Sequence, residues 1–579
     1  MPPSRSPEER LGTLSEYPWL AHYPAHLDYF SQIEPEPLWA LWDAAVESYP
    51  HHPFVDFLGR RFTYADVDQM IDRAAKGFQD LGVGPGVTVG LFLPNCPQFI
   101  ICFYGVLKAG GTVASFSPLY AEPELIFQIE DSRTDIMVTL NLEVLYSKMA
   151  RLLKESRLKK LVVGTLSEVL PFPKNILFPL ARARDISRIP NDPACIAFSQ
   201  LLNNDGNYNP TRPKVTDTAV LQYTGGTTGV PKGAMLSHGA IYTNVHQAGG
   251  WAADIENGNE RVMAVLPFFH VFSLNVVMNL AIRIGGELII HPRFELEPVL
   301  KDIAKKKPTF MMGVPTMFAA LNGAPDLAKY DLSSLKFCLS GGAPLPAEIK
   351  SRFENLTGCK LVEGYGLTEC SAVATANPFE GIQKEGSIGL PVPGTRIVIV
   401  EKDDPTKILD LGETGEICIE GPQLMSGYFG KEDETAKVLV AGRLLTGDVG
   451  YMDQDGFTFI IDRKKDLILA GGFNVFPRHI EEAIYQHPAV DEVIVIGIPH
   501  EYRGEAPKAF VKLKDLSEDL SREKLRDFLQ DKLGRHELPS EIEFRSELPK
   551  TLVGKLSKKE LVAEEAVKRE VGETGKSVS

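Results

Sequence analysis

A glycine- and threonine-rich segment between Tyr223 and Gly233 is the strongest indication of chemistry in this sequence. It reads YTGGTTGVPKG and follows the apolar run Ala219–Tyr223, a pattern that predicts a strand leading into a loop. Glycine lets backbone N–H groups approach phosphate oxygens, threonine hydroxyls add donors, and Lys232 adds a positive charge. We therefore predict a phosphate-binding loop. Its residues are Thr224, Gly225, Gly226, Thr227, Thr228, Gly229 and Lys232.

The spacing of this segment excludes the Walker A loop of P-loop NTPases. Five residues after Gly225 stands Val230 rather than glycine, and Pro231 precedes the lysine. The alternative is a flexible turn that binds nothing. A plain turn does not require all of these donors, so phosphate binding is the better interpretation.

A second segment, Gly364–Glu369, reads GYGLTE and combines three kinds of contact that a nucleotide needs. Tyr365 offers a flat aromatic face for a base. Thr368 can donate a hydrogen bond to a phosphate, and the carboxylate of Glu369 is a hard oxygen ligand suited to Mg²⁺. Such a string taken alone is more often only a helix start. Its weight comes from the other segments.

Two further residues fit the same nucleotide. Asp448 follows Thr-Gly and can accept hydrogen bonds from ribose hydroxyls, although Gly-Asp is an ordinary turn in most proteins. Lys555 could hold a carboxylate against a phosphate and screen their repulsion, or it could be one of several solvated lysines near the end of the chain.

Six segments, in this order along the chain, resemble the superfamily that contains acyl-CoA synthetases, luciferases and the adenylation domains of peptide synthetases. The resemblance implies an enzyme that uses ATP to convert a carboxylic acid into an acyl-AMP and then passes the acyl group to a thiol. The six segments are YTGGTTGVPKG at 223–233, SGGAP at 340–344, GYGLTE at 364–369, LTGD at 445–448, DRKK at 462–465 and PKTLVGK at 549–555.

The resemblance also implies a role for each motif. It assigns ATP, Mg²⁺ and coenzyme A to the site, with Thr368, Glu369, His270 and Lys555 at the reacting groups and Glu369 as the metal ligand. Lys465 becomes the pivot of a domain rotation, and Asn474 approaches the AMP. The remaining implied nucleotide and coenzyme A residues are Gly341, Gly342, Ala343, Pro344, Gly364, Tyr365, Gly366, Asp448, Arg463, Gly471 and Gly472.

The segment Pro267–Phe272, PFFHVF, resembles the acyl-pocket motif of the superfamily. His270 is either a packed histidine at a helix start or a group beside the reacting carboxylate. The segment has no acidic residue that could hold an amino-acid ammonium group. No carrier domain follows position 579, which favours a free thiol such as coenzyme A. The expected acyl-pocket residues are Phe268, Phe269, Phe272 and Leu274.

Longer stretches resemble bacterial long-chain fatty acid–CoA ligases: WLAHYP at 19–24, SPLY at 117–120, DRKKDLILAGGFNVFP at 462–477 and an excursion at about 155–215. Leu469 departs from luciferases and aryl ligases, which carry lysine before this loop. An aryl- or medium-chain acid–CoA ligase, a fatty acyl-AMP ligase and an inactive binding protein remain alternatives. Chain-length preference, oligomeric state (a homodimer included) and pathway stay open.

The strands and helices that must position these motifs follow the alternating pattern of an α/β protein. Strands are expected at 87–93, 112–117 and 135–140, and again at 262–266, 287–290, 309–313 and 336–340, with helices between them. This predicts a large N-terminal domain of two α/β layers plus a small β-barrel subdomain at 387–428. A mobile small α+β C-terminal domain follows. The expected boundaries are 1–462 and 463–579, with a hinge at 462–466 and a disordered tail at 565–579.

Composition sets the remaining limits. The net charge of -15 argues against a nucleic-acid partner, which needs a basic surface. Seven single cysteines without a CxxC pair favour the reducing cytoplasm. No apolar run reaches the length of a membrane-spanning helix. Residues 168–190 combine prolines, apolar residues and arginines, and are expected to be a surface excursion, with peripheral contact at the inner face of the membrane as the alternative.

Overall fold

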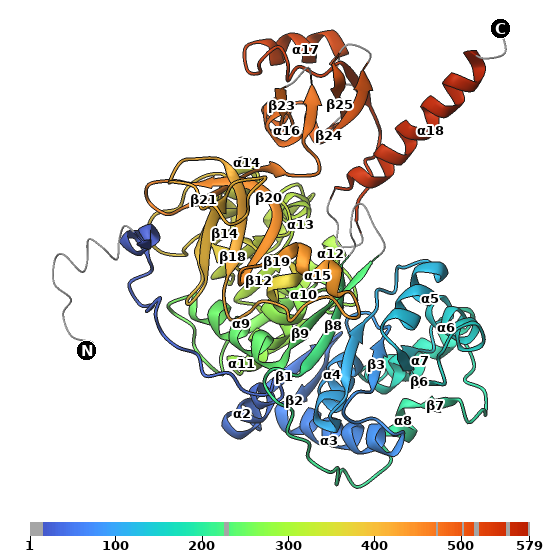
Figure 1. Cartoon of the computed structure of the whole chain (residues 1–579). Helices are drawn as coiled ribbons and strands as arrows, with labels where there is room; N and C mark the ends of the chain where they lie inside the picture. Colours follow the sequence, from blue (N-terminus) through green and yellow to red (C-terminus); the bar gives the residue numbers. More distant parts are fainter. Residues whose placement is uncertain are drawn as a thin grey trace, which may run out of the picture. The chain divides into compact units, whose positions relative to one another are not determined.

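The computed structural model describes residues 16–224, 231–470, 473–500, 503–514, 520–551 and 556–576. These residues form two compact units (Figure 1). The large unit comprises the described residues up to 224 together with 231–396 and 419–444. The small unit comprises 397–418 and the described residues from 445 onward.

The first sheet of the large unit carries both flanks of the predicted phosphate loop at one edge. Its strands run in the order β7-β6-β5-β3-β4-β8-β9, and all neighbours pair in parallel except β8 and β9. The antiparallel β8–β9 register places Thr224 opposite Lys232. The strands are β3 (Thr88–Leu91), β4 (Thr112–Ser115), β5 (Thr134–Leu140), β6 (Lys160–Gly164), β7 (Cys195–Ala197), β8 (Thr218–Thr224) and β9 (Lys232–Ser237).

The second sheet of the large unit is parallel through its centre and antiparallel at both ends. Its order is β16-β15-β14-β13-β12-β10-β11-β1-β2, with parallel pairing from β14 to β1. Two parallel-centred sheets confirm the predicted pair of α/β layers. The strands are β1 (Pro53–Phe57), β2 (Arg60–Thr63), β10 (Arg261–Ala264), β11 (Glu287–Ile290), β12 (Phe310–Gly313), β13 (Phe337–Gly341), β14 (Lys360–Tyr365), β15 (Thr375–Ala376) and β16 (Ser387–Pro391).

Local sequence signals explain where the helices begin. Helix α3 (Tyr64–Asp80) starts at Thr63, whose hydroxyl accepts from the Asp66 backbone while the Asp66 carboxylate accepts from the Thr63 backbone. Helix α4 (Pro97–Ala109) is buried along its whole length and ends at Gly110, whose φ of +90° suits glycine. The other main helices of the large unit are α2 (Ala40–Ser48), α5 (Glu122–Asp131), α6 (Glu143–Glu155), α8 (Phe198–Leu201), α9 (His238–Gly250), α11 (Leu280–Arg283), α12 (Leu296–Lys306), α13 (Pro315–Asn322), α14 (Ala347–Thr357) and α15 (Glu432–Val438).

The small unit contains two groups of strands. The first is ordered β17-β18-β20-β21 and lies largely in this unit; the second is ordered β23-β22-β25-β24, with β26 paired to β25. Helices α16 (Pro477–Tyr485) and α17 (Arg522–Gln530) cover the second group around a core that includes Ile480 and Leu525. The predicted α+β composition is confirmed. The strands are β17 (Arg396–Val400), β18 (Gly415–Glu420), β20 (Arg443–Met452), β21 (Thr458–Arg463), β22 (Ile468–Ala470), β23 (Phe473–Val475), β24 (Val490–His500), β25 (Gly504–Leu513) and β26 (Glu541–Phe544).

The end of the chain differs from the expected disordered tail. Helix α18 (Lys558–Lys576) continues through most of residues 565–579. Its Leu561 is buried against Phe510, and its Glu565 pairs with the buried ammonium of Lys508 at 3.0 Å. The polar composition that suggested fraying therefore includes residues that hold the helix against the small unit.

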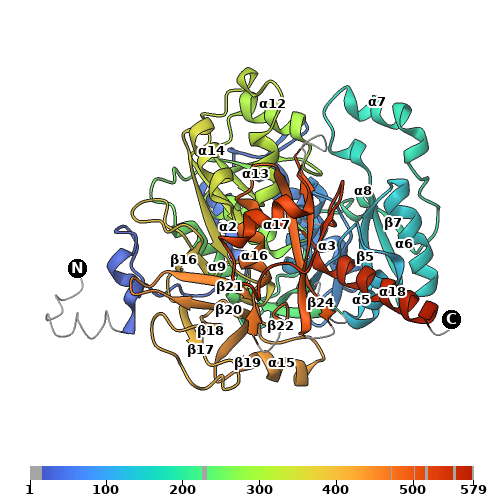
Figure 2. The ribbon, with the colours of Figure 1, turned by 90° about the horizontal axis from the view of Figure 1, so that it is seen from above.

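The excursion at 168–190 is a surface segment, as expected. It contains a short helix, α7 (Lys174–Ala181), between the turns η2 (Leu166–Glu168) and η3 (Ala183–Asp185). Figure 2 shows α7 at the periphery of the large unit, beyond α8. Among the described residues, no helix combines the length and apolar composition that crossing a bilayer requires.

Candidate active site

The register of β13 and β14 brings two predicted motifs to one edge of the second sheet. Gly341, the last residue of β13, lies opposite Gly364 near the end of β14. The SGGAP loop follows the first strand directly, and Tyr365 to Glu369 follow Gly364 on the second. The two loops are also tied together, because the Leu345 backbone donates to the Glu363 carboxylate at 3.2 Å.

The chain after Tyr365 makes an unusually close turn. A Cβ on Gly366 would lie 1.7 Å from the carbonyl oxygen of Ala372, so only glycine fits there. Ser371 and Ala372 have φ angles of +58° and +123°, which side-chain-bearing residues rarely adopt. Strained backbone of this kind concentrates at functional sites. Ser371 and Ala372 could not be identified from the sequence, since neither residue type signals a positive φ.

Glu369, the predicted metal ligand, has a hydrogen-bond donor from a distant part of the chain. The hydroxyl of Tyr428 donates to its Oε1 at 2.8 Å. Burial, and after it the charge of Glu369, raise the pKa of Tyr428, so the phenol stays protonated as a donor. Glu369 and Thr368 both lie half-buried in the short turn η6 (Thr368–Cys370). Tyr428 lies outside every motif, and no local signal could have identified it.

Lys232, the predicted phosphate-binding lysine, is held by two groups from the segment after β18. Its Nζ forms an ion pair with Glu434 of α15 and lies 5.1 Å from the centre of the Tyr428 ring. Hydrogen bonds from Lys232 and Lys437 lower the pKa of Glu434 to about 2. The lysine is thus positioned beside the same tyrosine that contacts Glu369, and an anionic phosphate would compete with Glu434 for it.

The acyl-pocket motif adjoins these loops but divides into two kinds of residue. Phe268 and Leu274 are fully buried, and Phe268 packs on Phe99 at a ring distance of 5.7 Å. Both are buried, and their place in an acyl pocket stays a prediction. Phe269 and Phe272 are half-buried. A Cβ on Gly341 would lie 3.1 Å from the Phe272 ring, which places this side chain directly against the SGGAP loop.

His270 lies at the start of a helical turn, a position that is compatible with both of its expected roles. It is the N-cap of the helical turn α10 (Val271–Ser273), and its Nδ1 accepts from the Phe272 backbone at 3.3 Å. The turn continues into a π-helical segment, η4 (Leu274–Asn279). Such segments are frequent at functional sites. The position of His270 relative to a carboxylate substrate stays a prediction.

The predicted ribose turn lies in the small unit. Asp448 on β20 pairs in register with Arg463 on β21, and Nε of Arg463 lies 3.0 Å from Oδ1 of Asp448. The Asp448 backbone also donates to Thr446 Oγ1 at 3.1 Å. The two residues that the resemblance assigns to one ribose are therefore neighbours, although they are separated in sequence.

The hinge segment contains a buried carboxylate that the sequence analysis did not single out. Asp462 accepts hydrogen bonds from the Arg463 and Arg478 backbones at 2.7 and 2.9 Å, which joins the end of β21 to the start of α16. Burial raises the pKa of Asp462 to about 6, against the opposing effect of Lys558. Lys465, the predicted pivot, is exposed three residues further on.

Several predicted residues lie outside the described part of the chain. For Asn474 the structure gives only the backbone, which pairs with Leu469 in the β22–β23 hairpin. The other predicted residues without a described position are Gly225, Gly226, Thr227, Thr228, Gly229, Gly471, Gly472 and Lys555.

We predict that Asp462 makes the stability of the small unit depend on pH. Its raised pKa means that its contribution is complete below about pH 4 and is lost as the pH rises through about 6. Between these two pH values the free energy of unfolding of the wild type should fall by about 3 kcal/mol relative to that of Asp462→Asn, whose side chain does not titrate. Thermal unfolding of both proteins from pH 3.5 to 7.5 measures this difference. Asp410→Asn, at an exposed position in the same unit, is the control, and a difference from wild type that stays constant with pH in Asp462→Asn would refute the assignment.

Comparison with known proteins places these motifs in a family. The family described as AMP-binding enzyme matches residues 42–429, and its C-terminal domain matches residues 479–555. The long-chain-fatty-acid–CoA ligase of Bacillus subtilis (strain 168) is 43% identical over 555 residues, covering 95% of this chain and 98% of that protein. The ligase of the same name from Escherichia coli O157:H7 is 36% identical, covering 94% and 97%.

A solved structure agrees with this assignment. ATP-bound MatB from Rhodopseudomonas palustris is 26% identical and superimposes with a TM-score of 0.79, covering 90% of this chain and 97% of that one. The matches extend over both units, and the resemblance predicted from the six motifs is confirmed: this chain belongs to the family of AMP-binding enzymes.

Proposed function

We propose that this chain is an ATP-dependent long-chain fatty acid–CoA ligase. The observation that carries the proposal is the β13–β14 register, which brings the SGGAP and GYGLTE motifs together at one sheet edge in a chain of this family. The choice of a long-chain fatty acid is supported by the ligases of Bacillus subtilis and Escherichia coli, which match nearly the whole chain.

The proposed reaction has two steps. The fatty acid carboxylate attacks the α-phosphorus of ATP, forming acyl-AMP and releasing pyrophosphate. The thiolate of coenzyme A then attacks the acyl carbon, forming acyl-CoA and releasing AMP. The α-phosphorus carries negatively charged oxygens, and the acyl carbon of acyl-AMP lies next to them. Hydrogen-bond donors and cations positioned around these oxygens would therefore lower the barrier of both steps most.

In the first step, the large unit supplies the groups around the phosphates. Lys232 would leave Glu434 for a phosphate, and Thr368 would donate to the α-phosphate. The half-buried carboxylate of Glu369, with Tyr428 donating to one oxygen, suits a magnesium ion that is otherwise held by phosphates and water. When bound, the ion neutralises phosphate charge. Tyr365 at the end of β14 would stack on adenine.

The small unit would bind the ribose and complete the two steps in turn. Asp448 and Arg463 are the proposed ribose contacts. Lys555 is proposed to hold the carboxylate at the α-phosphate during the first step, and Gly471 and Gly472 to leave room for pantetheine during the second. One face of a small domain can hardly present both groups at once, so we propose a rotation about Lys465.

Two rival activities use the same large unit. An aryl- or medium-chain acid–CoA ligase would differ in the acyl pocket, and a fatty acyl-AMP ligase would stop after the first step.

The proposal also includes a cytoplasmic location with contact at the inner face of the membrane, which the exposed apolar residues of α7 support.

Activity across chain lengths tests the proposal. If Phe269 and Phe272 border an acyl tunnel, each further buried methylene should add roughly 0.8 kcal/mol of binding until the tunnel ends. We therefore expect kcat/KM to rise from octanoate to palmitate, with acyl-CoA as the product identified by mass spectrometry. Preference for benzoate or coumarate would establish the aryl rival, and accumulation of acyl-AMP with coenzyme A present would establish the acyl-AMP ligase.

The charge and the hydrogen bond of Glu369 can be separated by a matched pair of variants. Glu369→Gln keeps the shape and removes the charge, so palmitate-dependent pyrophosphate release should fall at least ~10²-fold. Tyr428→Phe keeps the charge and removes one hydrogen bond, and should cost less than ~10-fold. Both rates are measured across a Mg²⁺ titration. Equal losses in the two variants, or a wild-type rate in Glu369→Gln, would remove this carboxylate from the metal site.

A further inference from the structure

Cys338 and Cys359 bring two thiols into contact within the large unit. Cys338 lies on β13, and Cys359 lies between the last residue of α14 and the first residue of β14. Their Sγ atoms are 3.5 Å apart, and both cysteines are reduced. Because the S–S bond of a disulfide is about 2.05 Å long, a movement of roughly 1.5 Å would allow the two sulfurs to bond. The pair is therefore placed to form a disulfide.

The two thiols differ in their surroundings. Cys338 is fully buried in an apolar core, and this burial raises the pKa of its thiol well above the ordinary value. Cys359 is 5% exposed, and its Sγ lies 3.0 Å from the hydroxyl oxygen of Thr357. The hydrogen bond with Cys338 lowers the pKa of Cys359, with a further contribution from Thr357 and against the opposing effect of burial. Since the thiolate is the reactive form of cysteine, Cys359 is the thiol that would react first.

Gly358 leaves open space next to Cys359. It ends α14 with a φ of +73°, and a Cβ at this position would meet nothing within 4 Å. A molecule as small as hydrogen peroxide would therefore reach Cys359 from this side. Cys338, in contrast, has no exposed surface of its own.

We propose that Cys338 and Cys359 form a peroxide-reactive thiol pair. Cys359 is oxidised first, and Cys338 then closes a reversible disulfide that prevents further oxidation of Cys359. The reactant is a small hydroperoxide, of which hydrogen peroxide is the simplest. This assigns chemistry to two residues that belong to none of the six motifs, and it does not depend on the proposed reaction.

The chemistry takes place in two balanced steps. In the first, the thiolate of Cys359 attacks one oxygen of hydrogen peroxide, so that an S–O bond forms and the O–O bond breaks. With uptake of a proton, the products are the sulfenic acid of Cys359 and one water. In the second, the sulfur of Cys338 attacks that of Cys359, and the thiol proton leaves with the hydroxyl group as a second water. Two thiols are thus oxidised and one peroxide is reduced. In a reducing compartment the disulfide would be transient, because cellular thiols reverse it.

Irreversible oxidation of Cys359 would affect the strand pair on which the proposed nucleotide site depends. Cys359 packs in the apolar core that contains Phe353 and Leu361, and Cys338 lies opposite Leu361 in the β13–β14 register. The sulfinic acid of Cys359 would ionise and place an anion in this core, which is costly without a partner. A disulfide keeps both sulfurs uncharged and can be reduced again. The pair therefore protects the packing of β13 against β14.

Peptide mapping of the whole chain after peroxide treatment tests the proposal without any turnover. Trypsin, which cleaves after lysine and arginine, releases Cys338 in the peptide 337–350 and Cys359 in the peptide 353–360. Remaining thiols are first blocked with iodoacetamide in denaturant, which prevents exchange. We expect mass spectrometry to find the two peptides joined in the treated wild type, and to find them separate after dithiothreitol.

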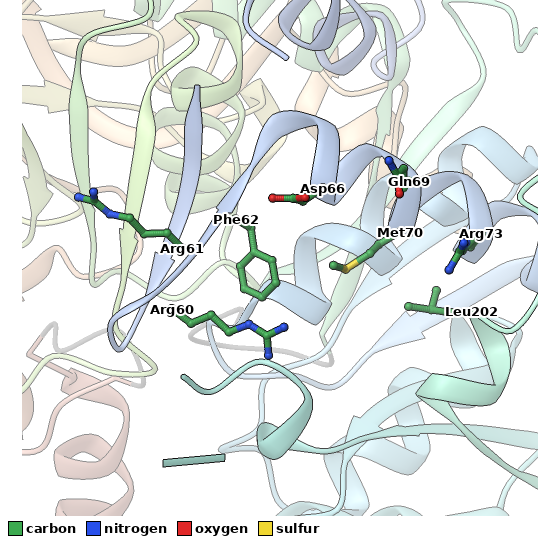
Figure 3. Close-up of a pocket in the computed structure, with 8 residues that line it drawn as sticks. All are labelled: Arg60, Arg61, Phe62, Asp66, Gln69, Met70, Arg73 and Leu202. Atoms are coloured by element: carbon green, nitrogen blue, oxygen red, sulfur yellow. The ribbon is translucent and has the colours of Figure 1, made fainter. Parts of the chain in front are cut away.

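Met70 provides an internal standard for the peroxide dose. Figure 3 shows its side chain in a pocket of about 310 Å³ between β2 and α3, which Phe62 and Leu202 also line. Its sulfur is half-buried, and peroxide converts methionine to the sulfoxide. Met70 is the sole methionine of the tryptic peptide 62–73, so its oxidation is read in the same digest. We expect the disulfide to be complete while most of Met70 is still unoxidised.

Three single variants separate the roles of the thiols. In Cys338→Ala, the sulfenic acid of Cys359 has no partner and should proceed to the sulfinic acid, which dithiothreitol does not reverse. In Cys359→Ala, Cys338 should remain a thiol at the same dose. Cys195→Ala, at a half-buried cysteine on β7, is the control and should form the disulfide as the wild type does. After peroxide and then dithiothreitol, the melting temperature should return to its starting value in the wild type and stay at least ~2 °C lower in Cys338→Ala.

Three results would overturn the proposal. The first is a wild type in which iodoacetamide still modifies both thiols when Met70 is fully oxidised. The second is a disulfide that joins Cys359 to a cysteine other than Cys338. The third is full recovery of the Cys359 thiol by dithiothreitol in peroxide-treated Cys338→Ala, since the neighbouring thiol would then not be what prevents further oxidation.

Discussion

Strand β13 pairs in parallel with β14 so that Gly341 lies opposite Gly364, and the rest of the proposed nucleotide site depends on this pairing. Parallel strands end at the same sheet edge, where loops from neighbouring strands meet. The register therefore sets the SGGAP loop beside Tyr365 and the turn that carries Glu369. Phe272 of the acyl motif also lies against Gly341. The residues expected to bind the fatty acid and those expected to bind adenine are therefore neighbours.

The proposed site also requires that the backbone at Gly366 pass very close to the backbone of residues 371–372. Gly366 has no space for a side chain, and the chain that crowds it, Ser371 and Ala372, is held at positive φ. The surrounding structure must stabilise this conformation, since each such residue costs of order 1–3 kcal/mol. Tyr428 and Glu434, from the segment after β18, then add the side chains that hold Glu369 and Lys232. The part of the proposed site that belongs to the large unit is assembled from a sheet edge, a strained turn and a segment distant in sequence.

The sequence predicted the features that depend on a local pattern of residues, namely the main strands and the motifs. The apolar runs became the strands of two parallel-centred sheets, and the six motifs identified the family. Contacts between distant residues carry no such signal, so Tyr428 and Glu434 were missed, and Asp462 was noted only as part of the hinge motif. Strands β1 and β2 were missed because they are only five and four residues long. The ion pair that joins Glu565 of α18 to Lys508 likewise links residues far apart in the sequence.

Nucleotide affinity in a Gly366 variant tests most directly whether the β13–β14 edge binds ATP. In Gly366→Ala the new methyl group would lie 1.7 Å from the Ala372 carbonyl oxygen, so the turn must move. A Cβ on Gly84 meets nothing within 4 Å, which makes Gly84→Ala the matched control. Titration calorimetry with ATP should show at least ~10-fold weaker binding for Gly366→Ala and unchanged binding for Gly84→Ala. Wild-type affinity in a folded Gly366→Ala protein would contradict the account.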